Sequence, residues 1–225
     1  MTLSAGRRTI ALNPFNHNKG RLGQIAFCNG VLLNFTTMTE KEALIDIIRE
    51  RSFQYTSEPS FKLSSGGVSR FYFNMKKTTQ SPDGMYLVGK LVFEKIKELG
   101  LTPAALGGLT MGADPIAYAV AMHSYYEKEP IQAFVIRKEP KEHGLKLPLE
   151  GNVKAGDHVV IIDDVVTTGG STIKAINVAK EYGLIIDAVI VLVDRCEQNG
   201  RQNIEALGYP VYDILTVSDF GEAKA

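Results

Sequence analysis

Short apolar segments rich in β-branched residues alternate with amphipathic segments along the second half of the chain. Apolar runs of this length are typical of buried strands, and strands buried on both faces lie in parallel sheets that helices cover. We expect strands at Ala104–Leu109, Ile131–Arg137, His158–Asp163, Asp187–Val193 and Val211–Thr216. The intervening segments Asp114–Tyr125 and Ser171–Tyr182 are predicted helices. The pattern therefore predicts an α/β fold with a mostly parallel, five-stranded sheet flanked by helices.

The segment before this pattern begins with a helix signal. Thr39 and Glu42 have the spacing of a capping box, in which two side chains satisfy the first N–H groups of a helix. Phe61–Asn74 alternates apolar and polar residues around two glycines, as in a hairpin, and Gly84–Leu99 has helical periodicity. We expect a small N-terminal hood over about residues 38–80.

The first 37 residues differ from the rest, because they contain basic residues but no Asp or Glu. We predict a poorly ordered extension over residues 1–37. Met38 directly precedes the helix signal, which leaves open that it is the true start. Residues 38–225 are then expected to form a single domain, of a size that one hydrophobic core can support.

Bulk composition argues against several classes of function. Lys plus Arg and Asp plus Glu each total 25, so the formal net charge is zero and gives no support to nucleic-acid binding. No apolar run approaches the roughly 18 residues that a membrane span requires. Cys28 and Cys196 form neither a CxxC pair nor a metal-ligand spacing, which favours reduced thiols in a cytoplasmic protein.

An acidic, glycine-rich run, Val159–Thr172, carries the clearest chemical signal. An apolar strand ends at Asp163-Asp164, and a Thr-Thr-Gly-Gly-Ser turn leads into a helix. Glycines let successive N–H groups point at one anion, and the helix N-terminus and the hydroxyl groups add donors. Two carboxylates beside such a cradle suit ribose hydroxyl groups or a cation. Helix capping and turn chemistry are the alternative for the glycines, and the GxGxxG and P-loop patterns are both absent.

The run resembles the signature with which type I phosphoribosyltransferases bind PRPP, the activated ribose phosphate. In that signature four apolar residues precede Asp-Asp and a Thr-Thr-Gly turn. The resemblance implies the type I phosphoribosyltransferase fold, with the carboxylates at the ribose hydroxyl groups and the turn around the 5′-phosphate. The PRPP-binding residues implied within the run are Asp163, Asp164, Val165, Val166, Thr167, Thr168, Gly169, Gly170 and Ser171.

A basic segment opens the polar loop that follows the second predicted strand. Arg137, Lys138, Lys141 and His143 place three cations and a histidine within seven residues. Fixed cations can stabilise a departing pyrophosphate, and a mobile loop can exclude water from a reactive centre. A solvated, charged loop is the alternative.

The spacing Arg-Lys-x-x-Lys-x-His-Gly resembles the catalytic loop of orotate phosphoribosyltransferases. The resemblance implies a mobile loop over about residues 138–152 in which Lys141 and His143 are catalytic. It also implies that Arg137 and Lys138, together with these two residues, bind PRPP. In that family the loop reaches into the other subunit, so we expect a homodimer in which each loop completes the partner's site.

Two further segments could recognise a base. Phe61–Gly66, followed by Phe71–Phe73, offers backbone donors next to glycine and aromatic faces, although core packing would also explain the aromatic residues. Arg195 follows a predicted strand, where a surface ion pair is the alternative. The Phe-x-Leu-x-Ser-Gly pattern of Phe61–Gly66 and the Asp194-Arg195 pair match positions that surround orotate in the family. The resemblance therefore implies that Thr167 and Arg195 contact orotate. Ser64 and Gly112 stand where some relatives carry lysine.

The resemblance implies transfer of the 5-phosphoribosyl group from PRPP to orotate, giving orotidine 5′-monophosphate and pyrophosphate in pyrimidine (UMP) biosynthesis. Mg²⁺ is the implied cofactor, held mainly by PRPP and pyrophosphate and not by direct side-chain ligands. Two alternatives stay open. A purine phosphoribosyltransferase would lack the basic loop, and a non-catalytic PRPP-sensing regulator predicts a winged helix or a basic face.

Overall fold

The computed structural model describes residues 25–28, 31–34, 38–62, 66–139 and 148–221. The chain divides into two units, Met1–Met38 and Thr39–Ala225. In the first unit, β1 (Ile25–Cys28) and β2 (Val31–Asn34) pair as an antiparallel hairpin that the sequence did not predict. The second unit contains the sheet, the hood and the helices described below.

A six-stranded sheet in the order β12-β11-β10-β7-β8-β9 forms the centre of the second unit. Its strands are β7 (Ala105–Leu109), β8 (Gln132–Ile136), β9 (Leu149–Gly151), β10 (His158–Val166), β11 (Ile185–Asp194) and β12 (Val211–Thr216). Every neighbouring pair is parallel except β8–β9. The five predicted parallel strands are confirmed, and a short antiparallel strand is added at one edge.

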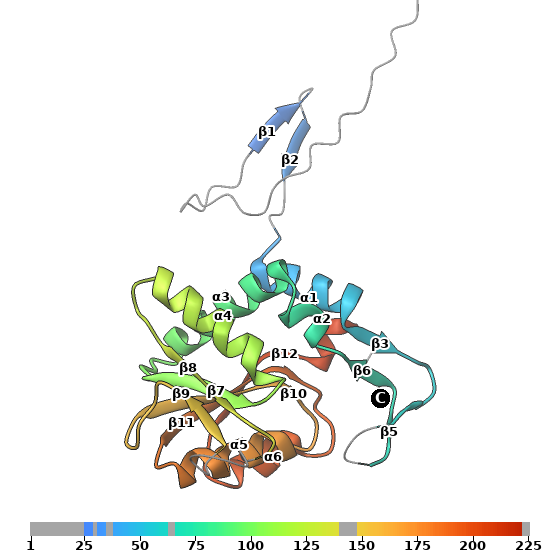
Figure 1. Ribbon diagram of the computed structural model, residues 1–225. Helices are drawn as coiled ribbons and strands as arrows, with labels where there is room; N and C mark the ends of the chain where they lie inside the picture. Colours follow the sequence, from blue (N-terminus) through green and yellow to red (C-terminus); the bar gives the residue numbers. More distant parts are fainter. Residues whose placement is uncertain (1–24, 29–30, 35–37, 63–65, 140–147, 222–225) are drawn as a thin grey trace, which may run out of the picture. The chain divides into compact units, whose positions relative to one another are not determined.

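Helices cover both faces of this sheet (Figure 1). On one face lie α1 (Glu40–Arg51), α3 (Pro82–Glu98) and α4 (Ala113–Tyr126), and on the other lie α5 (Gly170–Glu181) and α6 (Gly200–Glu205). Successive residues of β10 alternate between the two cores: Val160 and Ile162 pack on the first side, Val159 and Ile161 on the second. A strand places neighbouring side chains on opposite faces, so a strand buried on both sides needs a continuous apolar run.

Several strand boundaries differ from the prediction by one or two residues, and two larger differences concern β10 and β9. β10 continues three residues beyond Asp163, because Val165 and Val166 still pair with Val193 and Asp194 of β11. β9 lies within the segment predicted as a mobile loop and pairs Leu149 with Ile136 of β8. A three-residue strand has too little periodicity to be recognised locally, and its partner supplies the pairing.

The predicted hood consists of short elements. β3 (Phe53–Tyr55) pairs with β6 (Phe71–Phe73), and β4 (Phe61–Lys62) pairs with β5 (Val68–Ser69), both antiparallel; α2 (Lys76–Thr79) follows. Phe53 stacks on Phe220 of the 3-10 helix η1 (Val217–Phe220), with ring centroids 5.2 Å apart. Arg51 forms a two-pronged ion pair with Asp83, with both N–O distances 2.8 Å. These contacts join the hood to α3 and to the last turn of the domain.

The capping box predicted at Thr39 and Glu42 is present at the start of α1. The Thr39 hydroxyl accepts from the Glu42 N–H at 3.2 Å, and the Glu42 carboxylate accepts from the Thr39 N–H at 2.7 Å. Both bonds of the capping box are therefore present.

The strand order reverses between β7 and β10. From β7 the chain moves to β8 on one side, and it then crosses to β10 on the other side of β7. In open parallel sheets a crevice opens beyond the carboxyl ends of the strands at such a point, and ligands bind there. A ligand site is therefore expected beside the residues that follow Leu109 and Ile162.

Gly108→Ala should destabilise the packing of β7 against β10. A Cβ at residue 108 would lie 2.1 Å from the carbonyl oxygen of Ile162 and 2.9 Å from the Cβ of Ala113. The backbone of β10 cannot move away without breaking the sheet, so we expect a loss of about 3 kcal/mol in the free energy of unfolding. Urea denaturation followed by circular dichroism measures this loss.

Gly170→Ala is the matched control, because the nearest atom to its added Cβ, apart from chain neighbours, is Thr168 Oγ1 at 3.6 Å. We expect its free energy of unfolding to stay within about 0.5 kcal/mol of the wild-type value. Equal midpoints for Gly108→Ala and the wild-type protein would contradict the close packing of β7 against β10.

Candidate active site

A cavity of about 600 Å³ opens beside the turn between β10 and α5. Such a volume lies in the usual range for sites that hold small ligands. The acidic run, the hood and the end of β11 all contribute to its wall. The lining residues are Lys62, Tyr72, Phe73, Val165, Thr167, Thr168, Gly169, Gly170, Ser171 and Arg195.

The turn Thr167–Ser171 has the geometry of an anion cradle. Gly169 has a φ of +79°, and α5 begins at the next residue. A Cβ on Gly169 would lie 2.9 Å from the carbonyl oxygen of Gly200, so the position requires glycine on two grounds. The N-cap residue has no side chain to cap the helix, and the N–H of Gly170, the first residue of α5, makes only a long hydrogen bond of 3.4 Å to the Thr168 hydroxyl. The start of α5 can therefore still donate to an anion, and the helix dipole favours negative charge there.

Asp163 fastens this turn to the sheet. Its side chain is buried, and its carboxylate accepts hydrogen bonds from the Ser171 hydroxyl at 2.7 Å, the Thr172 hydroxyl at 2.5 Å and the Asp164 N–H at 3.0 Å. Burial, followed by the charge of Asp164, raises the pKa of Asp163 to about 6, although the hydroxyl donors oppose the change. The turn is thus held by a carboxylate that is costly to ionise.

The carboxylate of Asp164, unlike that of Asp163, lies beside Gly112 in the loop before α4. A Cβ at Gly112 would meet the Asp164 carboxylate at 2.6 Å, so glycine at this position makes room for the charge. Burial raises the pKa of Asp164, and the positive charge of Lys76 in the hood acts in the opposite direction. The carboxylate also accepts from the N–H of Val165 at 2.9 Å.

Arg195 joins the end of β11 to the hood. Its guanidinium Nη2 donates to the Ser69 hydroxyl at 2.7 Å and to the Phe71 carbonyl at 3.0 Å, and it lies 2.7 Å from the Glu197 carboxylate. The side chain is 5% exposed, and its buried Nε has no hydrogen-bond partner within the described residues. Burial lowers the pKa of Arg195, against the effect of Glu197. The cavity wall therefore contains a cation whose side chain is almost wholly buried.

The described ends of the basic loop lie at the edge of the sheet. The Arg137 N–H donates to the Pro148 carbonyl at 2.7 Å, and the Arg137 side chain pairs with Glu150 at 3.4 Å. Lys174 of α5 donates to the Lys138 carbonyl at 2.7 Å. Lys141 and His143 lie outside the described residues.

Comparisons with known proteins agree with this geometry. The model of the phosphoribosyl transferase domain family matches residues 75–220. The orotate phosphoribosyltransferase of Aquifex aeolicus (strain VF5) is 48% identical over 182 residues, which are 81% of this chain and 98% of that protein. The chain belongs to the orotate phosphoribosyltransferase family. The predicted fold family and enzyme class, a glycosyltransferase that transfers a phosphoribosyl group, are confirmed.

Solved structures of family members have the same fold. Orotate phosphoribosyltransferase of Mycobacterium tuberculosis H37Rv in complex with Fe(III) dicitrate has a TM-score of 0.70 and 30% identity, covering 81% of this chain and 99% of that one. The same enzyme in complex with PRPP has a TM-score of 0.64 and 26% identity, covering 81% of this chain and 92% of that one.

Within this orotate phosphoribosyltransferase fold, the predicted site residues take different places. Val165, the turn Thr167–Ser171 and Arg195 line the cavity together. Arg137, Lys138, Asp163, Asp164 and Val166 do not belong to its described lining. Val166 is buried in the core, and Asp163 faces the hydroxyl groups of α5.

Several residues around the site were missed in the sequence. Glu197 and Ser69 form the polar surroundings of Arg195, and Lys76 acts on Asp164. The signal for Glu197 was its position two residues after Arg195, but pairing with Ser69 depends on the folded hood. Neither of the other two belonged to a motif.

Two further properties concern the described part of the chain. No cluster of three or more His, Cys, Asp or Glu side chains there could hold a metal ion. No helix in the same part has the length and apolar character needed to cross a bilayer.

Stability should depend on pH through Asp163. The pKa of Asp163 is about 6 in the folded protein and 3.8 ordinarily, so between these pH values the folded state binds more protons than the unfolded state. The free energy of unfolding should therefore fall as pH rises from about 4 to 6, by at most about 3 kcal/mol. We expect Asp163→Asn to flatten this part of the melting-temperature curve, measured by calorimetry without ligands.

Asp83→Asn serves as the control, because Arg51 lowers the pKa of Asp83. A carboxyl group with a lowered pKa loses its stabilising effect only when the pH falls below the group's ordinary pKa. Asp83→Asn should therefore show the same fall in stability between about pH 4 and 6 as the wild-type protein. The assignment fails if Asp163→Asn shows that fall as well.

Proposed function

We propose that the protein transfers the 5-phosphoribosyl group of PRPP to orotate, giving orotidine 5′-monophosphate and pyrophosphate in pyrimidine (UMP) biosynthesis. One observation carries this proposal. A single cavity is lined by the anion cradle Thr167–Ser171, by the aromatic residues Tyr72 and Phe73, and by the buried cation Arg195. A phosphate, a flat ring and a carboxylate need these three kinds of surface.

The chemistry follows from the charges around the cavity. Orotate reacts as the anion that has lost its N1 proton to solvent. N1 forms a bond to C1 of the ribose while the C1–O bond to pyrophosphate breaks, and pyrophosphate leaves with the electron pair of that bond. Positive charge develops on the ribose, where the negative charge of Asp163 and Asp164 stabilises it. Thr167 and Arg195 hold the base in this proposal. Lys141 and His143 meet the departing pyrophosphate, and Arg137 and Lys138 support PRPP binding.

Mg²⁺ is the proposed cofactor, and when bound it neutralises charge on the pyrophosphate. The side chains suit a cation near the ribose, because Asp163 and Asp164 are adjacent carboxylates whose pKa values are both raised. A nearby cation would favour their ionised forms. We propose that PRPP and pyrophosphate supply most of the oxygen ligands.

Similarity to named relatives supports orotate over a purine as the acceptor. The Aquifex aeolicus protein carries the name orotate phosphoribosyltransferase, and the structure of the Mycobacterium tuberculosis enzyme was determined with PRPP. The purine phosphoribosyltransferase and the PRPP-sensing regulator remain the alternatives that assays must exclude. Cys196 is a free thiol, in keeping with the cytoplasmic location that we propose.

We also propose a homodimer in which each basic loop, about residues 138–152, completes the partner's site. The outer face of α4 supports an association surface. Tyr118, Met122 and Tyr125 recur at spacings that bring them to one side of a helix, and they are 54%, 62% and 73% exposed. Large exposed aromatic and Met side chains are enriched at protein interfaces.

The loss of orotate absorbance on mixing with PRPP and Mg²⁺ tests the reaction, with adenine, hypoxanthine and uracil as competing acceptors. We expect Lys141→Ala to lower kcat by about 100-fold, because a cation at the leaving group acts mainly in the transition state. Its dissociation constant for orotate, measured by calorimetry, should change less than about threefold.

Lys154→Ala, which removes an exposed lysine beyond the loop, should keep the wild-type kcat and serves as the control. No loss of orotate with micromolar wild-type enzyme would overturn the proposed function. Equal effects of Lys141→Ala on kcat and on orotate binding would instead overturn only the catalytic role of Lys141.

Subunit complementation tests the homodimer. Gly170→Asp places a carboxylate in the anion cradle, and Lys141→Ala disables the loop, so each variant alone should retain no more than about 1% of wild-type activity. If loops act in the partner's site, mixing and re-equilibrating the two variants should restore about one quarter of wild-type activity, since half of the dimers would be mixed and have one intact site. A mixture as inactive as its components would contradict the shared site.

A further inference from the structure

The turn that carries Arg195 into the cavity has an unfavourable backbone. It joins β11 to α6, and Cys196, Gln198 and Asn199 have φ values of 54°, 52° and 57°. The left-handed region costs a residue other than glycine roughly 1 kcal/mol, and Asn tolerates it best. A turn with three such residues keeps its shape only if contacts at its ends hold it.

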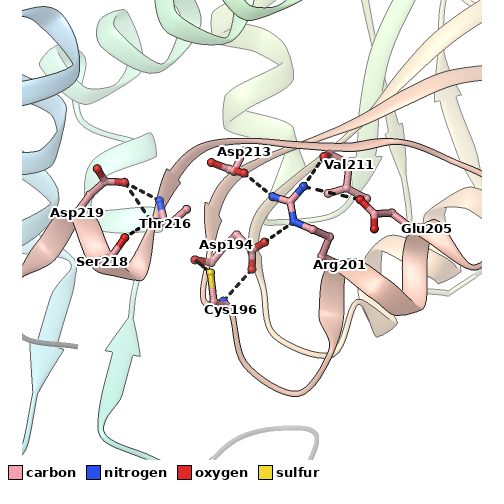
Figure 2. A network of polar contacts seen from close by, with 9 residues as sticks. All are labelled: Asp194, Cys196, Arg201, Glu205, Val211, Asp213, Thr216, Ser218 and Asp219. Atoms are coloured by element: carbon pink, nitrogen blue, oxygen red, sulfur yellow. Dashed lines mark hydrogen bonds and ion pairs between the residues drawn. The ribbon is translucent and has the colours of Figure 1, made fainter. Parts of the chain in front are cut away.

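Asp194 supplies the contact at the first end. This carboxylate is 4% exposed, and its two oxygens have different partners (Figure 2). Oδ1 accepts from the Cys196 N–H at 2.8 Å, and Oδ2 accepts from Arg201 Nε at 3.0 Å. One buried side chain therefore connects the second residue of the turn to the first turn of α6.

Arg201 is itself fixed from the other side. Its Nη1 and Nη2 atoms donate to the Val211 carbonyl and the Asp213 carboxylate of β12, and Glu205 lies 3.8 Å away (Figure 2). The guanidinium group thus divides its donors between two tasks. Nε holds Asp194, and the terminal nitrogens hold β12.

The contacts of Asp194 and Arg201 affect the cavity through Arg195. Arg195 directly follows Asp194, and its guanidinium contacts Ser69 and the Phe71 carbonyl of the hood. Glu197, two residues further along the same turn, pairs with Arg195 and accepts from Ser69 at 3.0 Å. The orientation of Arg195 and of its counter-charge therefore depends on the shape of one turn.

We propose that Arg201, acting through Asp194, is a positioning residue for base binding: it holds the turn that presents Arg195 to the base. Arg201 is not part of the described cavity lining, so its effect would be indirect. The inference rests on the proposed function, in which Arg195 contacts orotate. It predicts that an ion pair remote from the cavity governs affinity for the base more than affinity for PRPP.

Two isosteric variants separate the two tasks of Arg201. Asp194→Asn leaves one acceptor oxygen for two N–H donors, those of Cys196 and Arg201, so one of the two hydrogen bonds that hold the turn is lost. The contacts of Arg201 with β12 remain. Asp213→Asn removes the charge that pairs with Arg201 on β12 but leaves both oxygens of Asp194 in place. Both variants remove one negative charge from the same network, which makes them a matched pair.

For Asp194→Asn we expect the KM for orotate and its calorimetric dissociation constant to rise about tenfold, while the KM for PRPP stays within about twofold. Asp213→Asn should lower the melting temperature yet keep both KM values within about twofold of wild type. If Asp194→Asn does not fold, Arg201→Lys replaces it, since a single ammonium group cannot contact both carboxylates with the guanidinium's geometry.

The outcomes distinguish this inference from the proposed function. A wild-type enzyme that consumes orotate, with an unchanged orotate KM in Asp194→Asn, overturns the positioning role alone. The positioning role also fails if Asp194→Asn and Asp213→Asn raise the orotate KM equally, or if the KM values for orotate and PRPP rise together. A wild-type enzyme that consumes no orotate overturns the proposed function, and the positioning role with it.

Discussion

The buried carboxylate of Asp163 is the interaction on which the site depends. It accepts hydrogen bonds from two hydroxyl groups of α5 and from the N–H of Asp164, and so holds the start of the helix against β10, three residues before that strand ends. Because Asp163 and the start of α5 are held together, the turn Thr167–Ser171 curves around the space where an anion fits. Burial of the same side chain raises the cost of its ionisation, which the hydroxyl donors offset only in part.

The parts of the fold that could be predicted from the sequence are those whose physical cause is local or periodic. Strands buried on two faces require continuous apolar runs, which revealed the five parallel strands and the helices between them. The end of β10 was placed three residues early, because an acidic pair usually ends a buried strand, whereas here pairing with β11 continues to Val166. β9 and α6 were missed, since three and six residues carry too little pattern of their own.

The same distinction applies to the site. The turn Thr167–Ser171 was predictable because its glycines, hydroxyl groups and helix start are contiguous. The surroundings of Arg195 were not, because Ser69 lies 126 positions away and reaches it only through the folded hood. Asp194 and Arg201 were equally hidden, since their contact depends on a turn with three left-handed residues that no spacing rule describes. The roles of Lys141 and His143 stay predictions from the resemblance.

Gly112 has a consequence for how such sites can diverge. The family resemblance implies lysine at this position in some relatives, yet here even a methyl group would lie 2.6 Å from the Asp164 carboxylate. The positive charge that acts on Asp164 comes instead from Lys76, a residue of the hood. Exchanging glycine for lysine at residue 112 is therefore not an independent substitution. The acidic side chain would have to rotate, and the cation at residue 76 would become redundant, so these three positions should change together in related sequences.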